Sequence, residues 1–335
     1  MLINFQRKAN FRVFSTNASS VVKTISMLLV SFILFFAAPS QAQSTGIEVK
    51  SENFIFIGDV SKKDGERLVK DLEIFRLSLF KLFGVELQTE AVPVRIYAFK
   101  KNARFQSFVK NKTVAGVYKK GSQGPMFVLD ATGGVTQGDA ARRVAMHEYV
   151  HHVIATYTDQ KFPRWYNEGY ANFLANFKIK DNKIIIGAPD KNYARYLRSA
   201  KWMPMDTLIA SVNRYPFTSG SNRSNQRATQ QAFYSQSWLA VTYMQTHPEY
   251  ARKSTAYLNK INRGEDSIQA FNATFEQSPE DFGWVLKKFL KKNKYLHYPL
   301  PLKDSERNPP MITKQLDESQ FKAGVDQARI IYNLN

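Results

Sequence analysis

The chain contains 335 residues with a formal net charge of +19, and 44% of its residues are hydrophobic. This composition is sufficient for a globular core, in one large domain or two modest ones. The chain has no cysteine, so disulfides, thiolate metal sites and a cysteine nucleophile are all excluded. Any metal site must therefore be built from carboxylates and from the five histidines.

Residues 1–42 have the features of a secretory signal peptide. Four basic residues and no acid precede or border the apolar run ISMLLVSFILFFAA, and the small residues of Ser40-Gln41-Ala42 follow it. This pattern predicts cleavage after Ala42. An uncleaved membrane anchor is the alternative, but the run is short for a span of roughly 20 residues. We therefore expect a periplasmic or secreted protein without a stable membrane span after cleavage, one that does not depend on disulfides.

The loss of residues 1–42 removes four positive charges and lowers the net charge from +19 to +15. The clearest basic run is the five lysines between 287 and 294, on a predicted helix whose other face is apolar: Phe282, Trp284, Leu286, Phe289 and Leu290. A basic surface favours anionic partners such as envelope polymers. A helix packed on one side and solvated on the other explains the run more simply. The run matches no nucleic-acid motif, so we expect no nucleic-acid partner.

Residues 43–160 alternate between strand and helix patterns. The predicted elements are a strand at 47–57, a helix at 64–83, a strand at 92–99, a short helix at 102–110, a hairpin formed by 114–118 and 126–129, and a long helix at 138–157. This order predicts a mixed α/β subdomain.

Residues 161–294 have mainly helical patterns. The segment FPRWYNEGYANFLANF begins at a proline turn and becomes a helix, KIKDNKIII is typical of a hairpin turning at Asp181-Asn182, and helices follow from 226 to 292. Four prolines after residue 295 predict an extended tail at 295–335. The fold class is therefore α+β, with a mixed sheet and helices followed by a mainly α-helical half.

The sequence His147-Glu148-Tyr149-Val150-His151 is the strongest chemical signal in the chain, and it lies inside the predicted helix 138–157. Histidines four residues apart on a helix are separated by roughly 40° around the axis and about one turn along it. Both imidazoles can therefore bind one zinc ion at about 2.0–2.1 Å. Glu148 follows His147 directly, so its carboxylate lies beside the ion and can take a proton from the attacking water.

The apolar residues around this motif place its helix in the core: Val144, Ala145, Val150, Val153 and Ile154. A buried His-Glu-His cluster without a metal is costly to desolvate. Chance occurrence on a surface helix is therefore the weaker interpretation, and the motif predicts one zinc ion per chain.

A catalytic zinc needs a third protein ligand and one open position. We expect Glu168 to be that ligand, because it starts a second helix that can pack against the first. A first-turn acid favoured by the helix dipole is the alternative, but the position shortly after the histidine motif favours a ligand. Gly169, which has no side chain, allows the two helices to approach closely.

The remaining candidates for the third ligand are weaker. His152 lies roughly 140° from His147 around the helix, so it points away from the metal face. His247 and His297 have no metal-binding neighbours in the sequence, and Asp159 follows the first helix too closely to be placed.

The pattern His147-Glu148-x-x-His151 followed by Trp165-x-Asn167-Glu168-Gly169-x-Ala171 resembles the gluzincin branch of zinc peptidases. Within that branch the chain is similar to the bacterial peptidase-MA-like family, which is also described as a domain of unknown function. The resemblance extends to Phe233-Tyr234-Ser235-Gln236-Ser237-Trp238, and more loosely to the helices between Ala270 and Leu290.

This resemblance implies a zincin-like active site between a twisted sheet and a helical lower subdomain that carries the third ligand. It places an edge strand, here residues 125–130, over the active site, where it can hold an extended peptide by strand addition. It also implies that Tyr234 donates to the developing oxyanion, although a core aromatic at helical spacing is equally compatible. Aminopeptidases of this clan carry a Gly-x-Met-Glu-Asn segment. The chain has Gly124-Pro125-Met126-Phe127 without that glutamate, which argues against aminopeptidase activity.

The sequence therefore predicts an exported zinc metallopeptidase that hydrolyses peptide or protein substrates. His147, His151 and Glu168 are the expected metal ligands, and Glu148 is the expected general base. An envelope binding protein on a peptidase-like scaffold is one alternative, against which Glu148 argues because a binder needs no base. A hydrolase of a non-protein amide, such as a cell-wall crosslink, is the other alternative, and it uses the same chemistry.

Overall fold

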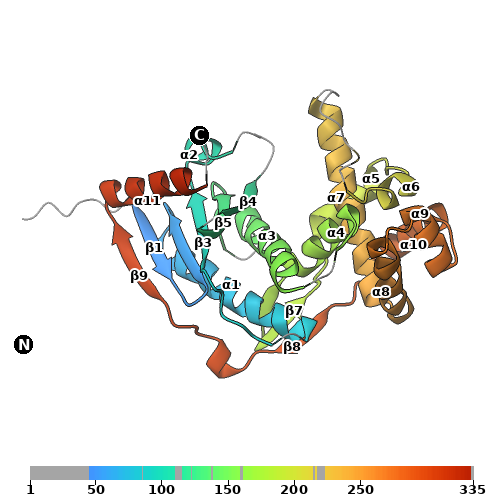
Figure 1. Ribbon diagram of the computed structural model, residues 1–335, viewed down its shortest axis with the longest axis horizontal. Helices are drawn as coiled ribbons and strands as arrows, with labels where there is room; N and C mark the ends of the chain where they lie inside the picture. The colour runs from blue at the N-terminus through green and yellow to red at the C-terminus, as the bar shows by residue number, and fades with distance from the viewer. Residues whose placement is uncertain are drawn as a thin grey trace, which may run out of the picture. The chain divides into compact units, whose positions relative to one another are not determined.

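A six-stranded mixed sheet is the framework that positions the rest of the chain (Figure 1). The computed structural model describes residues 45–84, 86–109, 115–121, 123–136, 139–158, 161–213, 216 and 223–332. The strand order is β4-β5-β3-β2-β1-β9, in which β2, β3 and β5 are parallel and the other pairs are antiparallel. The strands are β1 (Gly46–Lys50), β2 (Phe54–Gly58), β3 (Val94–Phe99), β4 (Gly116–Gly121), β5 (Gly124–Asp130) and β9 (Ile312–Leu316).

Apolar residues cover both faces of this sheet, because successive residues of a strand point in opposite directions. Phe56, Ile96 and Phe127 belong to the core beneath helices α1 and α3. Tyr97 and Val128 belong to a second cluster beneath α2 and α11 on the other face (Figure 1). The covering helices are α1 (Lys62–Phe83), α2 (Asn102–Gln106), α3 (Ala140–Tyr157) and α11 (Glu318–Ile331).

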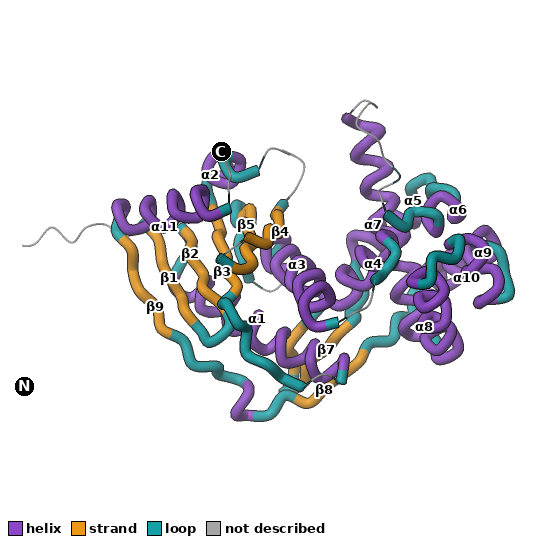
Figure 2. The backbone as a smooth tube through the Cα atoms, viewed as in Figure 1, coloured by secondary structure: helices purple, strands orange, loops and turns teal. Residues whose placement is uncertain are grey.

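Helices dominate the second half, as the sequence predicts. They are α4 (Arg164–Ala175), α5 (Lys191–Ser199), α6 (Met205–Ile209), α7 (Arg223–Thr246), α8 (Pro248–Asn262), α9 (Ser267–Phe275) and α10 (Pro279–Lys292). A small antiparallel sheet accompanies them (Figure 2), formed by β6 (Lys178–Lys180), β7 (Lys183–Ile186) and β8 (Tyr298–Pro301). The α+β class with a mixed sheet and a helical second half is thereby confirmed.

The predicted hairpin at Asp181-Asn182 is confirmed as the β6–β7 connection. Both turn residues have positive φ angles, 48° and 58°. Two-residue hairpin loops favour this left-handed backbone because its twist matches that of the strands. By contrast, the strand predicted over residues 47–57 is a hairpin of two strands, β1 and β2, since Ser51–Asn53 turn the chain back on itself.

The extended tail predicted at 295–335 is wrong for the described residues up to 332. Strand β9 pairs along the whole of β1, and α11 packs its buried Phe321, Val325 and Ala328 on the sheet. The prolines that suggested a tail are compatible with sheet structure: Pro299 and Pro301 lie in β8, an edge strand of the small sheet. Proline is tolerated there because an edge strand has a side that needs no N–H donor.

Helix α10 carries four of the five lysines of the run, Lys294 lying beyond its end, and its apolar face is smaller than predicted. Phe282 and Leu286 are fully buried, whereas Trp284 is 57% exposed. The Nζ of Lys287 lies 4.5 Å from the centre of the Trp284 indole ring. Trp284 therefore belongs to the solvated side of the helix, where a lysine covers its ring.

The described residues from 45 to 332 belong to one compact unit. The predicted subdomains 43–160 and 161–294 both lie within this one unit, and the predicted signal segment 1–42 lies outside the described residues. Within the described part of the chain, no helix combines the length and the apolar character that a membrane span requires.

Candidate metal centre

Helix α3 presents two different faces to its surroundings. Ala145, Tyr149 and Val153 are buried in the core beneath the sheet. His147 and His151 are one turn apart on the face that meets α4, with ring centres separated by 4.6 Å. The apolar face thus fixes the orientation of α3, and the helical period directs both imidazoles towards α4.

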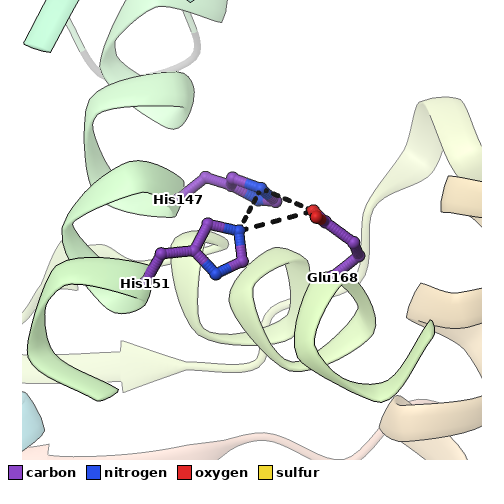
Figure 3. A group of neighbouring side chains, drawn as sticks. All are labelled: His147, His151 and Glu168. Carbon is purple, nitrogen blue, oxygen red and sulfur yellow. Dashed lines mark hydrogen bonds and ion pairs between the residues drawn. The ribbon is translucent and has the colours of Figure 1, made fainter. Parts of the chain in front are cut away.

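Glu168 completes the group from the first turns of α4 (Figure 3). Its Oε2 lies 3.1 Å from Nε2 of His147 and 3.4 Å from Nε2 of His151. The two Nε2 atoms lie 3.0 Å apart. The structure therefore brings together the three residues that the sequence predicted as ligands, and this group could hold a metal ion.

The spacing of these three atoms fits a small cation. Ligand atoms of a tetrahedral ion with bonds of about 2.0–2.1 Å lie roughly 3.3 Å apart. The observed separations run from 3.0 to 3.4 Å. A hydrogen bond between the two Nε2 atoms uses the lone pair of only one of them. A cation at the common centre accepts both nitrogen lone pairs and also contacts the carboxylate.

Asn167 and Arg164 support the group from α4. Oδ1 of Asn167 lies 3.3 Å from Nδ1 of His151, and an amide oxygen can only accept, so Nδ1 carries the proton. In the neutral ring, Nε2 of His151 then carries a lone pair, which is directed at the centre of the three-residue group. Nη1 of Arg164 lies 3.9 Å from Oε1 of Glu168, the oxygen that faces away from the histidines. Such outer contacts orient ligands and are typical of metal sites.

Burial and close contact shift the pKa values of Glu168 and His151 in opposite directions. Burial alone raises the pKa of Glu168, but its contacts with His147 and His151 outweigh burial and hold that pKa well below 4.5. Burial lowers the pKa of His151, and the Glu168 carboxylate reverses this and raises it above 6.5. Negative charge at Glu168 is therefore favoured beside any positive charge, from a proton or from a metal.

Glu148 lies beside the group in a cleft of about 570 Å³. The cleft contains His147 and is lined by side chains from α3, α4, α5 and α7 and by the start of β4: Ala115, Gly116, Arg143, Val144, His147, Glu148, Asn172, Tyr193, Arg227, Gln230, Gln231 and Tyr234. Burial raises the pKa of the Glu148 carboxyl, while His147 and His151 partly oppose the rise. Glu148 faces the same space as His147 without belonging to the ligand group.

Two tyrosines face the cleft. Tyr234, which the family resemblance singled out, lies there with His147 and Glu148. Tyr193 lies there too and places its O–H 3.4 Å from Oδ1 of Asn172. Burial raises the pKa of Tyr193 far above 10, so its proton stays in place. The sequence pattern gave no signal for Tyr193, because α5 approaches α3 only through the tertiary fold.

The expected edge strand at 125–130 is wrong. Strand β5 lies between β4 and β3, and the edge is β4. Gly116, the first residue of β4, and Ala115 directly before it line the cleft. A Cβ on Gly116 would lie 2.4 Å from Cγ1 of Val144, so only glycine lets this edge approach α3 so closely.

The other histidines lie outside the group, as predicted. His152 is 2% exposed and contacts Glu90 and Tyr118. Nδ1 of His247 lies 2.8 Å from the carbonyl oxygen of Tyr243, and its ring stacks on that tyrosine. His297 is exposed, and Asp159 lies outside the described residues.

The expectation for Gly169 needs correction. A Cβ at this position would lie 2.3 Å from the carbonyl oxygen of Ser237 and 2.7 Å from Cγ2 of Val241, both on α7. The glycine therefore permits the close packing of α4 on α7, not of α4 on α3. This contact still serves the site, because α7 carries Tyr234 and α4 carries Glu168.

Comparison of the chain with models of protein families finds no match, and comparison with curated proteins finds none either.

Proposed function

We propose that this protein is a zinc-dependent hydrolase of amide bonds, with peptide bonds as its substrates. The observation that carries this proposal is the placement of Glu148 in a cleft beside the His147-His151-Glu168 group. A structural metal site is normally closed by four protein ligands, whereas three ligands beside an open cleft are typical of catalytic sites.

The donor set favours zinc among common cations. Two imidazole nitrogens and one carboxylate oxygen suit zinc, whereas calcium and magnesium prefer oxygen ligands. Bound zinc supplies Lewis-acid polarisation of the scissile carbonyl and lowers the pKa of a water molecule.

Glu148 is the proposed general base. It takes a proton from the attacking water and passes it to the nitrogen of the leaving amine. Burial raises its pKa, which makes the carboxylate a better proton acceptor than an exposed glutamate. A hydroxyl donor in the cleft, Tyr234 or Tyr193, can stabilise negative charge that develops on the carbonyl oxygen.

Strand β4 supports a peptide as the substrate. It is an edge of the main sheet and borders the cleft at Ala115 and Gly116. The unpaired backbone groups of an edge strand can bind an extended chain by strand addition. The resemblance to gluzincins adds to this proposal, and membership of the peptidase-MA-like family is part of it.

Export is a separate part of the proposal. It rests on the basic and apolar pattern of residues 1–42, and it places the protein in the periplasm or outside the cell. Amino-terminal sequencing of protein from the envelope fraction should give a first residue close to Gln43. Recovery of the full-length chain in membranes contradicts cleavage and favours the anchor.

A non-protein amide remains the second candidate substrate, because the same residues perform the same proton transfers on it. An envelope binding protein is less compatible with Glu148. The deciding experiment is cleavage of a peptide library by the zinc-loaded protein, analysed by mass spectrometry, with and without a zinc chelator. Cleavage that stops with chelator and in Glu148→Gln supports the peptidase, and a protein that binds zinc but cleaves no peptide contradicts it.

A further inference from the structure

A polar stripe on α7 faces the cleft that contains His147 and Glu148. Its members are spaced at i, i+3, i+4 and i+7 and so share one face of the helix: Arg227, Gln230, Gln231 and Tyr234. A face that only packed against a core would be apolar at this spacing, as α7 is further on, where Trp238, Leu239 and Val241 are buried. The stripe instead offers hydrogen-bond donors to a molecule in the cleft.

Arg143 brings a second guanidinium to the same cleft, from α3. Its Nη1 donates to Oδ2 of Asp190 at 3.2 Å, and Asp190 is 3% exposed. Oδ1 of Asp190 accepts from the backbone N–H groups of Asn192 and Tyr193 at the start of α5. The arginine is therefore oriented by a buried carboxylate that is itself fixed. The remaining nitrogens of its planar fork stay available to a ligand.

The charge of the cleft indicates what that ligand is. Among the described residues that line the cleft are these two arginines and one carboxylate, Glu148. We propose, on the basis of the hydrolase function above, that Arg143 and Arg227 select amide substrates that carry a carboxylate close to the scissile bond. Arginine suits this role because its fork matches the planar carboxylate with paired, charge-assisted hydrogen bonds.

The helix geometry limits where the carboxylate lies in the substrate. Arg143 precedes His147 by four residues, which places it slightly more than one helical turn, about 6 Å, along α3. An extended peptide advances about 3.3–3.6 Å per residue. The carboxylate therefore belongs to a residue one or two positions from the scissile bond. Its source is either an acidic side chain or the carboxyl terminus of the substrate.

The test begins with a peptide that the zinc-loaded full chain cleaves. This peptide is resynthesised with Glu, Gln or Lys at the two positions on each side of the scissile bond, and with a free or an amidated carboxyl terminus. At one position, kcat/KM for the Glu peptide should exceed that of the Gln peptide by about 10- to 100-fold, the usual effect of charge-assisted hydrogen bonds. If the terminus is the source, the free acid should exceed the amide by the same factor.

Substitutions then assign the effect to the arginines. Arg227→Gln should bring the ratio between the acidic and neutral peptides towards one, and Arg227→Glu should favour the Lys peptide. The matched control is Arg252→Gln on α8, an exposed arginine outside the cleft, which should keep the wild-type ratio. The proposal is overturned if, in the wild type, the Glu and Gln peptides are cleaved equally at every position and the free acid is cleaved no faster than the amide. An unchanged ratio in Arg227→Gln overturns it as well.

Failure of the hydrolase function is distinguished by binding. If no peptide is cleaved, labelled Glu and Gln peptides of one neutral backbone, with free and amidated termini, are titrated with the wild type and Arg227→Gln by fluorescence anisotropy. Tighter binding of a carboxylate peptide to the wild type, lost in the variant, supports anion recognition although the hydrolase function has failed. Equal binding of all the peptides overturns the anion site as well.

Discussion

Nε2 of His152 lies 3.2 Å from Oε2 of Glu90. His152 directly follows His151 of the candidate metal group in the sequence, but it lies on a different face of α3. A carboxylate only accepts, so Nε2 donates, and in the neutral ring Nδ1 accepts from Tyr118 at 3.2 Å. Glu90 also accepts from Tyr149 at 2.8 Å and from Tyr157 at 2.7 Å. These contacts connect α3 to the loop before β3 and to the edge strand β4.

The contacts of Glu90 predict that the wild-type fold loses stability in acid through this residue. A Glu90→Gln variant should lack this loss. Burial alone raises the pKa of Glu90, but hydrogen bonds from His152 and Tyr157 outweigh it, and the net pKa lies below 4.5. A carboxyl with a lowered folded-state pKa stabilises the fold fully above its unfolded-state pKa. That stability is lost as the pH falls from about 4.5 through the lower folded-state value.

Urea unfolding across pH measures this contribution. At pH 7 the wild type should be more stable than Glu90→Gln by about 1–3 kcal/mol, the effect of disturbing a buried charged hydrogen-bond acceptor. The difference should shrink as the pH falls below about 4.5. A difference that grows towards low pH contradicts the assignment of Glu90 as the charged acceptor.

Two glutamates of the site should respond differently to the same substitution. Glu148→Gln keeps the shape of the side chain and removes the base, so zinc content should stay near normal while turnover falls by about 10²–10⁴-fold. Glu168→Gln should instead weaken zinc binding, because a neutral amide replaces an anionic ligand. Zinc content by elemental analysis is compared with activity for both variants. Loss of zinc from Glu148→Gln to the same degree, or full activity in that variant, contradicts the proposed roles.

The two neighbouring histidines of α3 provide a second comparison. His147→Ala removes a ligand and should abolish stoichiometric zinc. His152→Ala should leave zinc content nearly intact, and it should destabilise the fold by about 1–3 kcal/mol because Glu90 and Tyr118 each lose a hydrogen-bond partner. Elemental analysis and urea unfolding of both variants check the pair. Zinc loss in His152→Ala with the fold intact would place that residue in the metal site.

The group of His147, His151 and Glu168 could be predicted from the sequence because two of its three members lie one turn apart on the same helix. The helical period alone brings His147 and His151 onto one face, and the hairpin at Asp181-Asn182 follows from the turn preferences of two residues. Glu168 required one tertiary assumption, the packing of α4 on α3, which the structure bears out.

The remaining features depend on pairings between distant segments. Strand β9 joins β1 across most of the chain, and β4 rather than β5 forms the edge, because strand order is set by long-range contacts that local patterns do not encode. Glu90 lies in a loop, so no periodicity relates it to His152. Tyr193 and Arg143 line the same cleft for the same reason. The spacing of Phe321, Val325 and Ala328 did carry a helical signal, which the nearby prolines obscured.

The contact between Gly169 and Ser237 yields a prediction in which two effects of opposite sign compete. Alanine is favoured over glycine inside a helix by roughly 1 kcal/mol. At position 169, however, the added Cβ would lie 2.3 Å from the carbonyl oxygen of Ser237, a backbone atom that cannot rotate away. Overpacking of this kind costs about 1–3 kcal/mol, so Gly169→Ala should be destabilising overall. Because α4 must shift, the zinc affinity of the Gly169→Ala protein should fall as well.

Gly324 of α11 is the matched control, since a Cβ there would meet only Cδ1 of Ile57 at 3.4 Å, an ordinary contact. Gly324→Ala should therefore be neutral or stabilising, with unchanged zinc binding. Thermal unfolding and zinc titration of both variants decide the matter, and a Gly169→Ala protein as stable as the wild type contradicts the close packing of α4 on α7.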